Sequence, residues 1–116
     1  MKDNIVVDKS KAFAVRIVRL YQYLHKEKNE YVLSKQLLRS GTSIGANVKE
    51  AIRGQSKADF YAKMCIASKE ASETEYWLEL LFETEYIDKK QFDNIYDDIQ
   101  ELLRLLVSIT KTINKN

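Results

Sequence analysis

The sequence predicts an all-α protein, an antiparallel up-down-up-down four-helix bundle. Three observations predict this fold class. Apolar residues recur at alternating spacings of three and four along four segments, which is the period of an amphipathic helix. The 116 residues include no proline, the residue that most strongly breaks helices. The segments between the four patterns are short, so neighbouring helices must run in opposite directions.

The first helix is expected over about residues 9–27, with Asp8 or Ser10 as its N-cap. The second is expected over about residues 33–53. The apolar line of the first helix consists of Phe13, Ile17, Leu20 and Leu24. The line of the second consists of Leu37, Gly41, Ile44, Val48 and Ala51.

The third helix is expected over about residues 57–83, where Ser56 can cap it and Asp59 follows three residues later. The fourth is expected over about residues 89–114, with Asp88 and Gln91 in the same arrangement. The third line consists of Phe60, Met64, Ala67, Ala71, Thr74, Leu78 and Leu81, and the fourth of Ile95, Ile99, Leu102, Leu106, Ile109 and Ile113. A repeat of about 3.5 residues predicts the shallow left-handed crossing of helical bundles.

Length and composition indicate a single domain, residues 1–116, of the ordinary globular class. The single cysteine, Cys65, excludes an internal disulfide and fits a reducing compartment. No apolar run approaches the length needed to span a bilayer, and the N-terminus has no signal-peptide core. We therefore expect a cytoplasmic protein that does not interact with membranes.

Two glycines, Gly41 and Gly45, lie in the stretch SGTSIGANVKEA. A phosphate-binding loop would need its glycines between a strand and a helix and a Lys-Ser or Lys-Thr pair at its end. Here the preceding segment has a helical pattern, and Val48 and Lys49 stand where that pair would be. The glycines are better explained as a helix face kept small for close packing, with Phe60 or Trp77 of the third helix as expected partners.

Residues 43–81 read SIGANVKEAIRGQSKADFYAKMCIASKEASETEYWLELL. The most characteristic blocks are SIGAN at 43–47, Glu50 with Ala51, Ser56 with Asp59 and Phe60, Ile66 with Ala67, and ETEYWL at 73–78. Together these blocks resemble the bacterial four-helix-bundle proteins first recognised as open reading frames in intervening sequences of 23S ribosomal RNA genes. The same family is similar to the accessory variability proteins of diversity-generating retroelements.

This resemblance implies a fold and an assembly more than an activity. Its members are pictured as small bundles that associate into homo-oligomeric rings, typically pentamers, without cofactors or catalytic residues, and they are often described as ribosomal-protein-like. The retroelement relatives are strongly basic and bind nucleic acid and a reverse transcriptase. This chain departs from them because its formal net charge is only +2.

Enzymatic chemistry finds little support in the sequence. The only histidine, His25, is expected at a solvated helix end, and Cys65 is expected to be a small packing residue. Glu70 and Glu73 lie close together on the third helix, but a di-iron site would need histidines that the last three helices lack. No enzyme, metal or cofactor is expected. Glu50 is expected to pair with Lys69 or another base in a neighbouring helix or subunit.

Basic residues are concentrated in the first part of the chain. Residues 1–69 hold fourteen Lys or Arg against six Asp or Glu, whereas residues 70–116 hold five against eleven. A stripe along the second helix carries Lys35, Arg39, Lys49 and Arg53, and the first helix adds Arg16, Arg19 and Lys26. Three interpretations stay open: a solvated face, a surface for RNA phosphates, and a surface for an acidic protein or the acidic half of a neighbouring subunit.

The third helix has apolar residues in addition to those of its apolar line. Ala62, Ile66, Trp77 and Leu80 lie well round the helix from its apolar line. Large apolar patches on a small protein usually mark association, so these four residues are the predicted oligomer interface. The sequence thus predicts a non-enzymatic, self-assembling scaffold that binds RNA through the basic stripe. The alternative is an adaptor whose basic half docks an acidic protein without nucleic acid.

Overall fold

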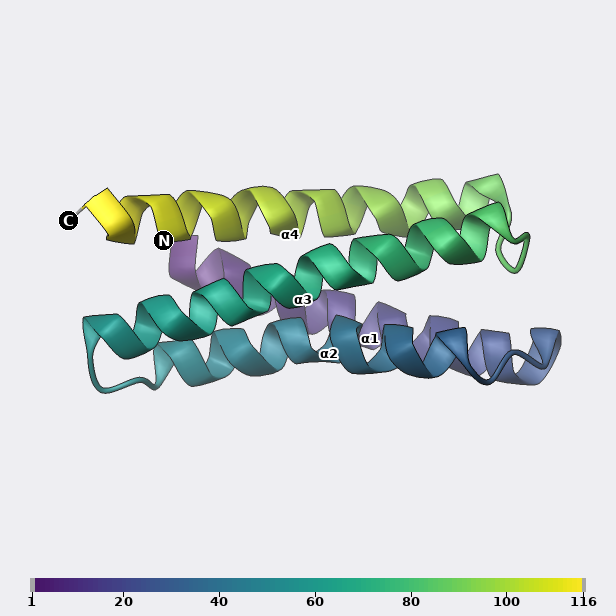
Figure 1. Ribbon diagram of the computed structural model, residues 1–116, viewed down its shortest axis with the longest axis horizontal. Helices are drawn as coiled ribbons and strands as arrows, with labels where there is room; N and C mark the ends of the chain where they lie inside the picture. The colour runs from purple at the N-terminus through teal and green to yellow at the C-terminus, as the bar shows by residue number, and fades with distance from the viewer. Residues whose placement is uncertain (1, 116) are drawn as a thin grey trace.

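The computed structural model describes residues 2–115, with side chains for residues 5–113. Four helices follow one another: α1 (Lys2–Lys28), α2 (Leu33–Ile52), α3 (Lys57–Glu83) and α4 (Lys89–Lys115). They alternate in direction and form an up-down-up-down bundle (Figure 1) that measures 46 × 21 × 19 Å. The predicted fold class is confirmed, and no strand occurs between residues 2 and 115.

The four apolar lines of the sequence form the core. Every member of the α2 line is buried, and so is every member of the α3 line except the half-buried Phe60. Leu20 of α1 and Ile113 of α4 are also only partly buried. Phe60 and Ile113 each lie within one turn of a helix end, where fewer neighbours cover the helix.

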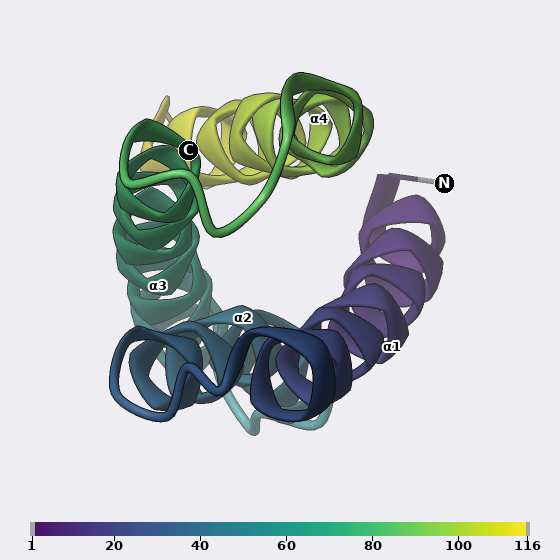
Figure 2. The same ribbon diagram turned by 90° about the vertical axis from the view of Figure 1, so that its right-hand side faces the viewer.

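Each helix contacts the next one along the chain, and α1 also contacts α4, which closes the ring. The α2–α3 contact is the most extensive and the α1–α4 contact the least. Seen from the end, α1 is tilted so that its last turns lie beside α2 and away from α4 (Figure 2). The bundle is therefore more open along one of its four seams.

The predicted N-caps of the third and fourth helices are confirmed, and α2 begins at Leu33 as predicted. The backbone N–H of Asp59 donates to the Ser56 hydroxyl at 3.0 Å. At the start of α4, the Gln91 N–H donates to Asp88 Oδ1 at 2.8 Å and the Asp88 N–H donates to Gln91 Oε1 at 2.9 Å, a complete capping box.

The predicted start of the first helix is wrong. Helix α1 begins at Lys2, six residues before Asp8, so neither Asp8 nor Ser10 caps it. Ser10 is buried inside the helix, where its hydroxyl donates to the Val7 carbonyl at 3.2 Å. A serine hydroxyl can accept from an N–H group at a cap or donate to a carbonyl inside a helix, so the presence of serine alone does not fix the boundary.

Candidate functional site

Both glycines of α2 face α1. A Cβ added at Gly41 would lie 2.8 Å from Cγ1 and from Cγ2 of Ile17, and one added at Gly45 would lie 3.3 Å from the Ser10 carbonyl oxygen. The stretch is helical throughout, so it is not a phosphate loop. The expected partners on the third helix, Phe60 and Trp77, were wrong: the bulky residue opposite Gly41 is Ile17. Periodicity places a residue on the core face but does not say which neighbour covers each flank.

Two of the seven basic residues predicted to bind nucleic acid are held by carboxylates of the same chain. Arg39 pairs with Glu73 and, at 3.3 Å, with Glu70. Arg16 pairs with Asp98 of α4, and its Nη2 donates to Asn94 Oδ1 at 2.7 Å. These guanidinium groups therefore tie helices together, which lowers their availability to an external phosphate.

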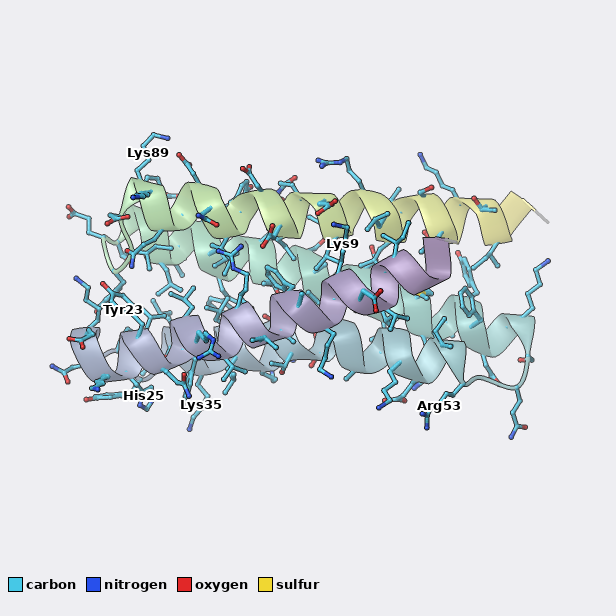
Figure 3. The ribbon with its side chains drawn as sticks, turned by 180° about the vertical axis from the view of Figure 1, so that it is seen from behind. Lys9, Tyr23, His25, Lys35, Arg53 and Lys89 are labelled. Carbon is cyan, nitrogen blue, oxygen red and sulfur yellow. The ribbon has the colours of Figure 1, made fainter. Side chains whose placement is uncertain are left out.

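The other five, Lys35, Lys49, Arg53, Arg19 and Lys26, are exposed. None of them has a carboxylate within ion-pair distance among the described side chains. Lys35 and Arg53 lie on the same edge of the bundle but near opposite ends of α2 (Figure 3). The stripe is thus a sparse row of cations rather than a dense patch.

The predicted interface residues of α3 differ in environment. Ala62 is exposed and the Ile66 side chain is 42% exposed, whereas Leu80 is half-buried. Next to them, Tyr76 is 55% exposed. Ala62, Ile66, Tyr76 and Leu80 are called the outer face of α3 below.

Trp77 has a second role that the sequence did not indicate. It is half-buried and packs against the core, and its Nε1 donates to Glu73 Oε2 at 3.0 Å. This bond from Trp77, together with Arg39, outweighs the effect of burial and holds the pKa of the Glu73 carboxyl below its ordinary value. Arg39, Glu73 and Trp77 therefore form a clip between α2 and α3.

The two side chains considered for nucleophilic chemistry, those of His25 and Cys65, lie beside tyrosines. His25 lies in the last turn of α1, at the helix end as expected, but it is partly covered there by the rings of Tyr21 and Tyr31, whose centroids are 4.5 and 4.7 Å away. Cys65 is half-exposed, and its hydrogen bond with Tyr61 raises the pKa of that phenol. Among the described residues, no three His, Cys, Asp or Glu side chains are grouped so that they could hold a metal ion.

Glu50 pairs with a base in the neighbouring helix, as expected, but the partner is Lys63 at 3.0 Å and not Lys69. Lys63 precedes Lys69 by six residues on α3, and the sequence alone does not give the register of α3 against α2. The bond lies at the surface, so its contribution to stability is small.

A polar cluster between α3 and α4 was missed. The Tyr96 hydroxyl donates to Glu79 Oε2 at 2.6 Å, and the pKa of this phenol is raised by that bond, by burial and by the charge of Glu75. Gln100 also donates to Glu75. The signal that could have found it is the i, i+4 spacing of the two glutamates on the flank of α3 that faces α4.

A groove between α1 and α2, which the sequence also did not reveal, has a volume of about 530 Å³. Its lining includes Val7, Lys11, Ala14, Ala46, Lys49 and Arg53. This is called the α1–α2 groove below. Lys11 was absent from the predicted basic surface, because the sequence does not show which face of α1 lies beside Lys49 and Arg53 of α2.

The family model of the 23S rRNA-intervening sequence protein matches residues 2–108 of the chain. The chain belongs to this family. The intervening-sequence family model thus covers all of α1, α2 and α3 and most of α4, and the expected family is confirmed.

A solved relative of the intervening-sequence protein is similar over nearly its whole length. It is a protein of unknown function from the S23 ribosomal protein family of Bacteroides thetaiotaomicron VPI-5482, known from a 1.70 Å crystal structure. The two chains share 61% identity with a TM-score of 0.94, over 96% of this chain and 99% of the relative. No curated protein matches the chain. Within the described residues, no helix of this intervening-sequence protein is both long and apolar enough to cross a bilayer.

Proposed function

We propose that this protein is a non-enzymatic scaffold that assembles from several copies of itself. The observation that carries this proposal is the outer face of α3, where Ile66 and Tyr76 are exposed although the core of the bundle is complete without them. Burying apolar side chains of this size contributes about 1.5–3 kcal/mol each relative to leaving them in water. The homo-oligomeric rings that the family resemblance implies, typically pentamers, are consistent with such a face.

A non-enzymatic role agrees with what the polar side chains do. His25 lies between two aromatic rings, and the glutamates of α3 that were considered for metal binding hold Arg39 instead. Their geometry supports the packing of helices. A nucleophile with its base would require a different arrangement.

Light scattering on the purified protein tests the assembly. We expect the wild type to be an oligomer and Ile66→Lys to dissociate it, because a desolvated ammonium at an apolar contact is costly. Val107→Lys is the matched control, since Val107 of α4 is 41% exposed and Ile66 is 42% exposed. A monomeric wild type would contradict the proposal, and so would an oligomer that Val107→Lys disrupts and Ile66→Lys does not.

The basic half of the chain supports a second function, as an adaptor for an acidic protein. The observation that favours it over RNA binding is the pairing of Arg16 and Arg39 with carboxylates of the same chain, which leaves a sparse stripe for phosphates. A dense row of free cations would be the expected arrangement for strong, salt-dependent RNA binding.

Filter binding of structured RNA at rising salt separates the two functions. The charge-reversal variant should change Lys35, Lys49 and Arg53 only, because changing Arg39 would also break its ion pairs with α3. The adaptor function predicts no RNA retention even at low salt. Salt-dependent retention that the triple variant loses would instead establish RNA as the partner of the basic surface.

A further inference from the structure

The α1–α2 groove lies at the end of the bundle where Arg53 projects (Figure 3). On the α2 side its lining extends from Thr42 to Arg53. Eleven residue steps at 1.5 Å each give a length of about 16 Å, which is three helical turns. On the α1 side the lining extends from Val7 to Ala14. Two antiparallel helices thus form the walls, an arrangement in which a third helix can dock.

Small side chains keep this groove open. Ala14, Gly45 and Ala46 all line it, and none of them projects beyond a Cβ atom. Gly45 also brings α1 close to α2, because any Cβ at this position would lie 3.3 Å from the Ser10 carbonyl oxygen. Apolar surface remains within reach of a ligand: Val7 lines the groove and Ile52, another lining residue, is 44% exposed.

Three cations border the groove: Lys11, Lys49 and Arg53. None of them has a carboxylate within ion-pair distance among the described side chains. By contrast, two nearby lysines are neutralised within the chain: Lys9 pairs with Glu101 at 3.1 Å, and Lys63 pairs with Glu50 at 3.0 Å. Asp8 is the one acid that lines the groove. The lining therefore carries a net positive charge that this chain does not neutralise.

We propose that the α1–α2 groove docks an amphipathic helix of an acidic protein, an inference that rests on the adaptor function and gives it a surface. Apolar side chains of the helix cover Val7, Ala46 and Ile52, and carboxylates along its flanks meet Lys11, Lys49 and Arg53. This is the helix-in-groove mode of recognition, in which spaced apolar anchors provide contact area and charges provide orientation.

The lining favours a helix over a nucleic acid. Phosphates would neutralise the cations but leave Ile52 and the alanines uncovered. Single-stranded nucleic acids gain much of their affinity by stacking bases on aromatic rings, and no aromatic side chain lines the groove. The apolar lining residues and the cations that border the groove together match an acidic helix that has one apolar face.

The test uses the full chain and a fluorescent peptide of about 18 residues that forms a helix with one Leu face and Glu flanks. A peptide with Lys in place of Glu and a single-stranded RNA oligonucleotide are the comparison probes. Anisotropy titrations at low and moderate salt report the affinity. We expect the Glu peptide to bind, and we expect neither the Lys peptide nor the RNA to bind.

Two groove variants and one control locate the binding. The double variant Lys49→Glu, Arg53→Glu should lower the affinity for the Glu peptide by roughly tenfold or more, which corresponds to about 1.4 kcal/mol of binding free energy. Ala46→Gln should also weaken it, because the longer polar side chain fills the groove without changing the charge. Lys26→Glu with Lys35→Glu makes the same change in net charge away from the groove and should change the affinity by less than about threefold.

The outcomes separate the groove from the adaptor function. One outcome is that both double charge-reversal variants lower the affinity for the Glu peptide equally and that the Ala46→Gln variant binds it normally. In that case the basic half of the chain binds acidic partners, but the groove is not the binding site. If no Glu peptide binds even at low salt, both proposals are wrong. If the Lys49 and Arg53 variant changes the oligomer size in light scattering, the occupant is a second copy of this chain and the proposed partner is wrong.

Discussion

At Gly41, the absence of a side chain allows two helices to touch. Both γ carbons of Ile17 would be 2.8 Å from an added Cβ, and the Ile17 Cβ would be 3.2 Å from it. Because the two γ carbons are equally close and a β-branched side chain has few rotamers in a helix, rotation about χ1 does not relieve the contact. Ile17 is also fully buried, so it has no space into which it can withdraw.

Gly41→Ala should therefore destabilise the protein, although alanine is the better helix former. The gain in helix propensity is about 1 kcal/mol, whereas overpacking a core costs about 1–3 kcal/mol. Denaturant unfolding at a fixed protein concentration measures the net effect. In an Ile17→Ala background the same change should be neutral or stabilising, because the γ carbons are gone. Stabilisation of the wild type by Gly41→Ala would contradict this account of the contact.

At the scale of one element, helix α2 begins without a conventional cap. Its N-cap position, Val32, has no side chain that accepts a hydrogen bond. Glu30 takes this role from two residues earlier: its carboxylate accepts from the backbone N–H of Val32, Leu33 and Ser34 at 3.1, 2.9 and 2.6 Å. Burial raises the pKa of the Glu30 carboxyl, but these hydrogen bonds outweigh it and hold the pKa below 4.5.

Glu30→Gln should cost about 1–3 kcal/mol at neutral pH, because hydrogen bonds to a charged acceptor are the stronger ones. Since the folded pKa is depressed, the stabilisation is present above pH 4.5 and is lost as the pH falls through the folded value. The difference between the wild type and the variant should shrink over that range in unfolding experiments. Glu27→Gln, a change at an exposed position, is the control. A difference that stays constant into acid would contradict the role of the charged carboxylate.

At the scale of the whole molecule, the bundle is strongest between α2 and α3 and weakest between α1 and α4. The α1–α4 seam includes Lys9 with Glu101 and Arg16 with Asp98, whose side chains are each about 40% exposed. Ion pairs as exposed as these contribute little, about 0–1 kcal/mol. Local opening of the bundle is therefore expected to start at this seam.

Native-state hydrogen exchange should reveal this order. Amides of α1 are expected to exchange at a lower free energy of opening than the central amides of α2 and α3, which carry the largest contact. Mass spectrometry of peptides from each helix would measure it. Equal protection of α1 and α3 would show that the bundle opens only as one unit.

The sequence was sufficient to predict the fold because each core line repeats regularly and no proline interrupts it. It did not predict the start of α1, where Ser10 turned out to be a buried residue inside the helix. Contacts between side chains of different helices were harder to predict than the ends of the helices. Gly41 was correctly assigned to a close helix contact, but its partner, Ile17, depends on how two helices are rotated against each other. The α1–α2 groove was not predicted for the same reason, since its lining comes from both helices. The predicted role of Trp77 in an oligomer interface stays a prediction.

The single thiol of the chain has a practical consequence for studying assembly. Cys65 is half-exposed and directly precedes Ile66 in the sequence. A maleimide dye would attach at this one position without any engineered substitution. Energy transfer between dyed copies would then report subunit exchange in real time, and its rate would show how long each assembly persists.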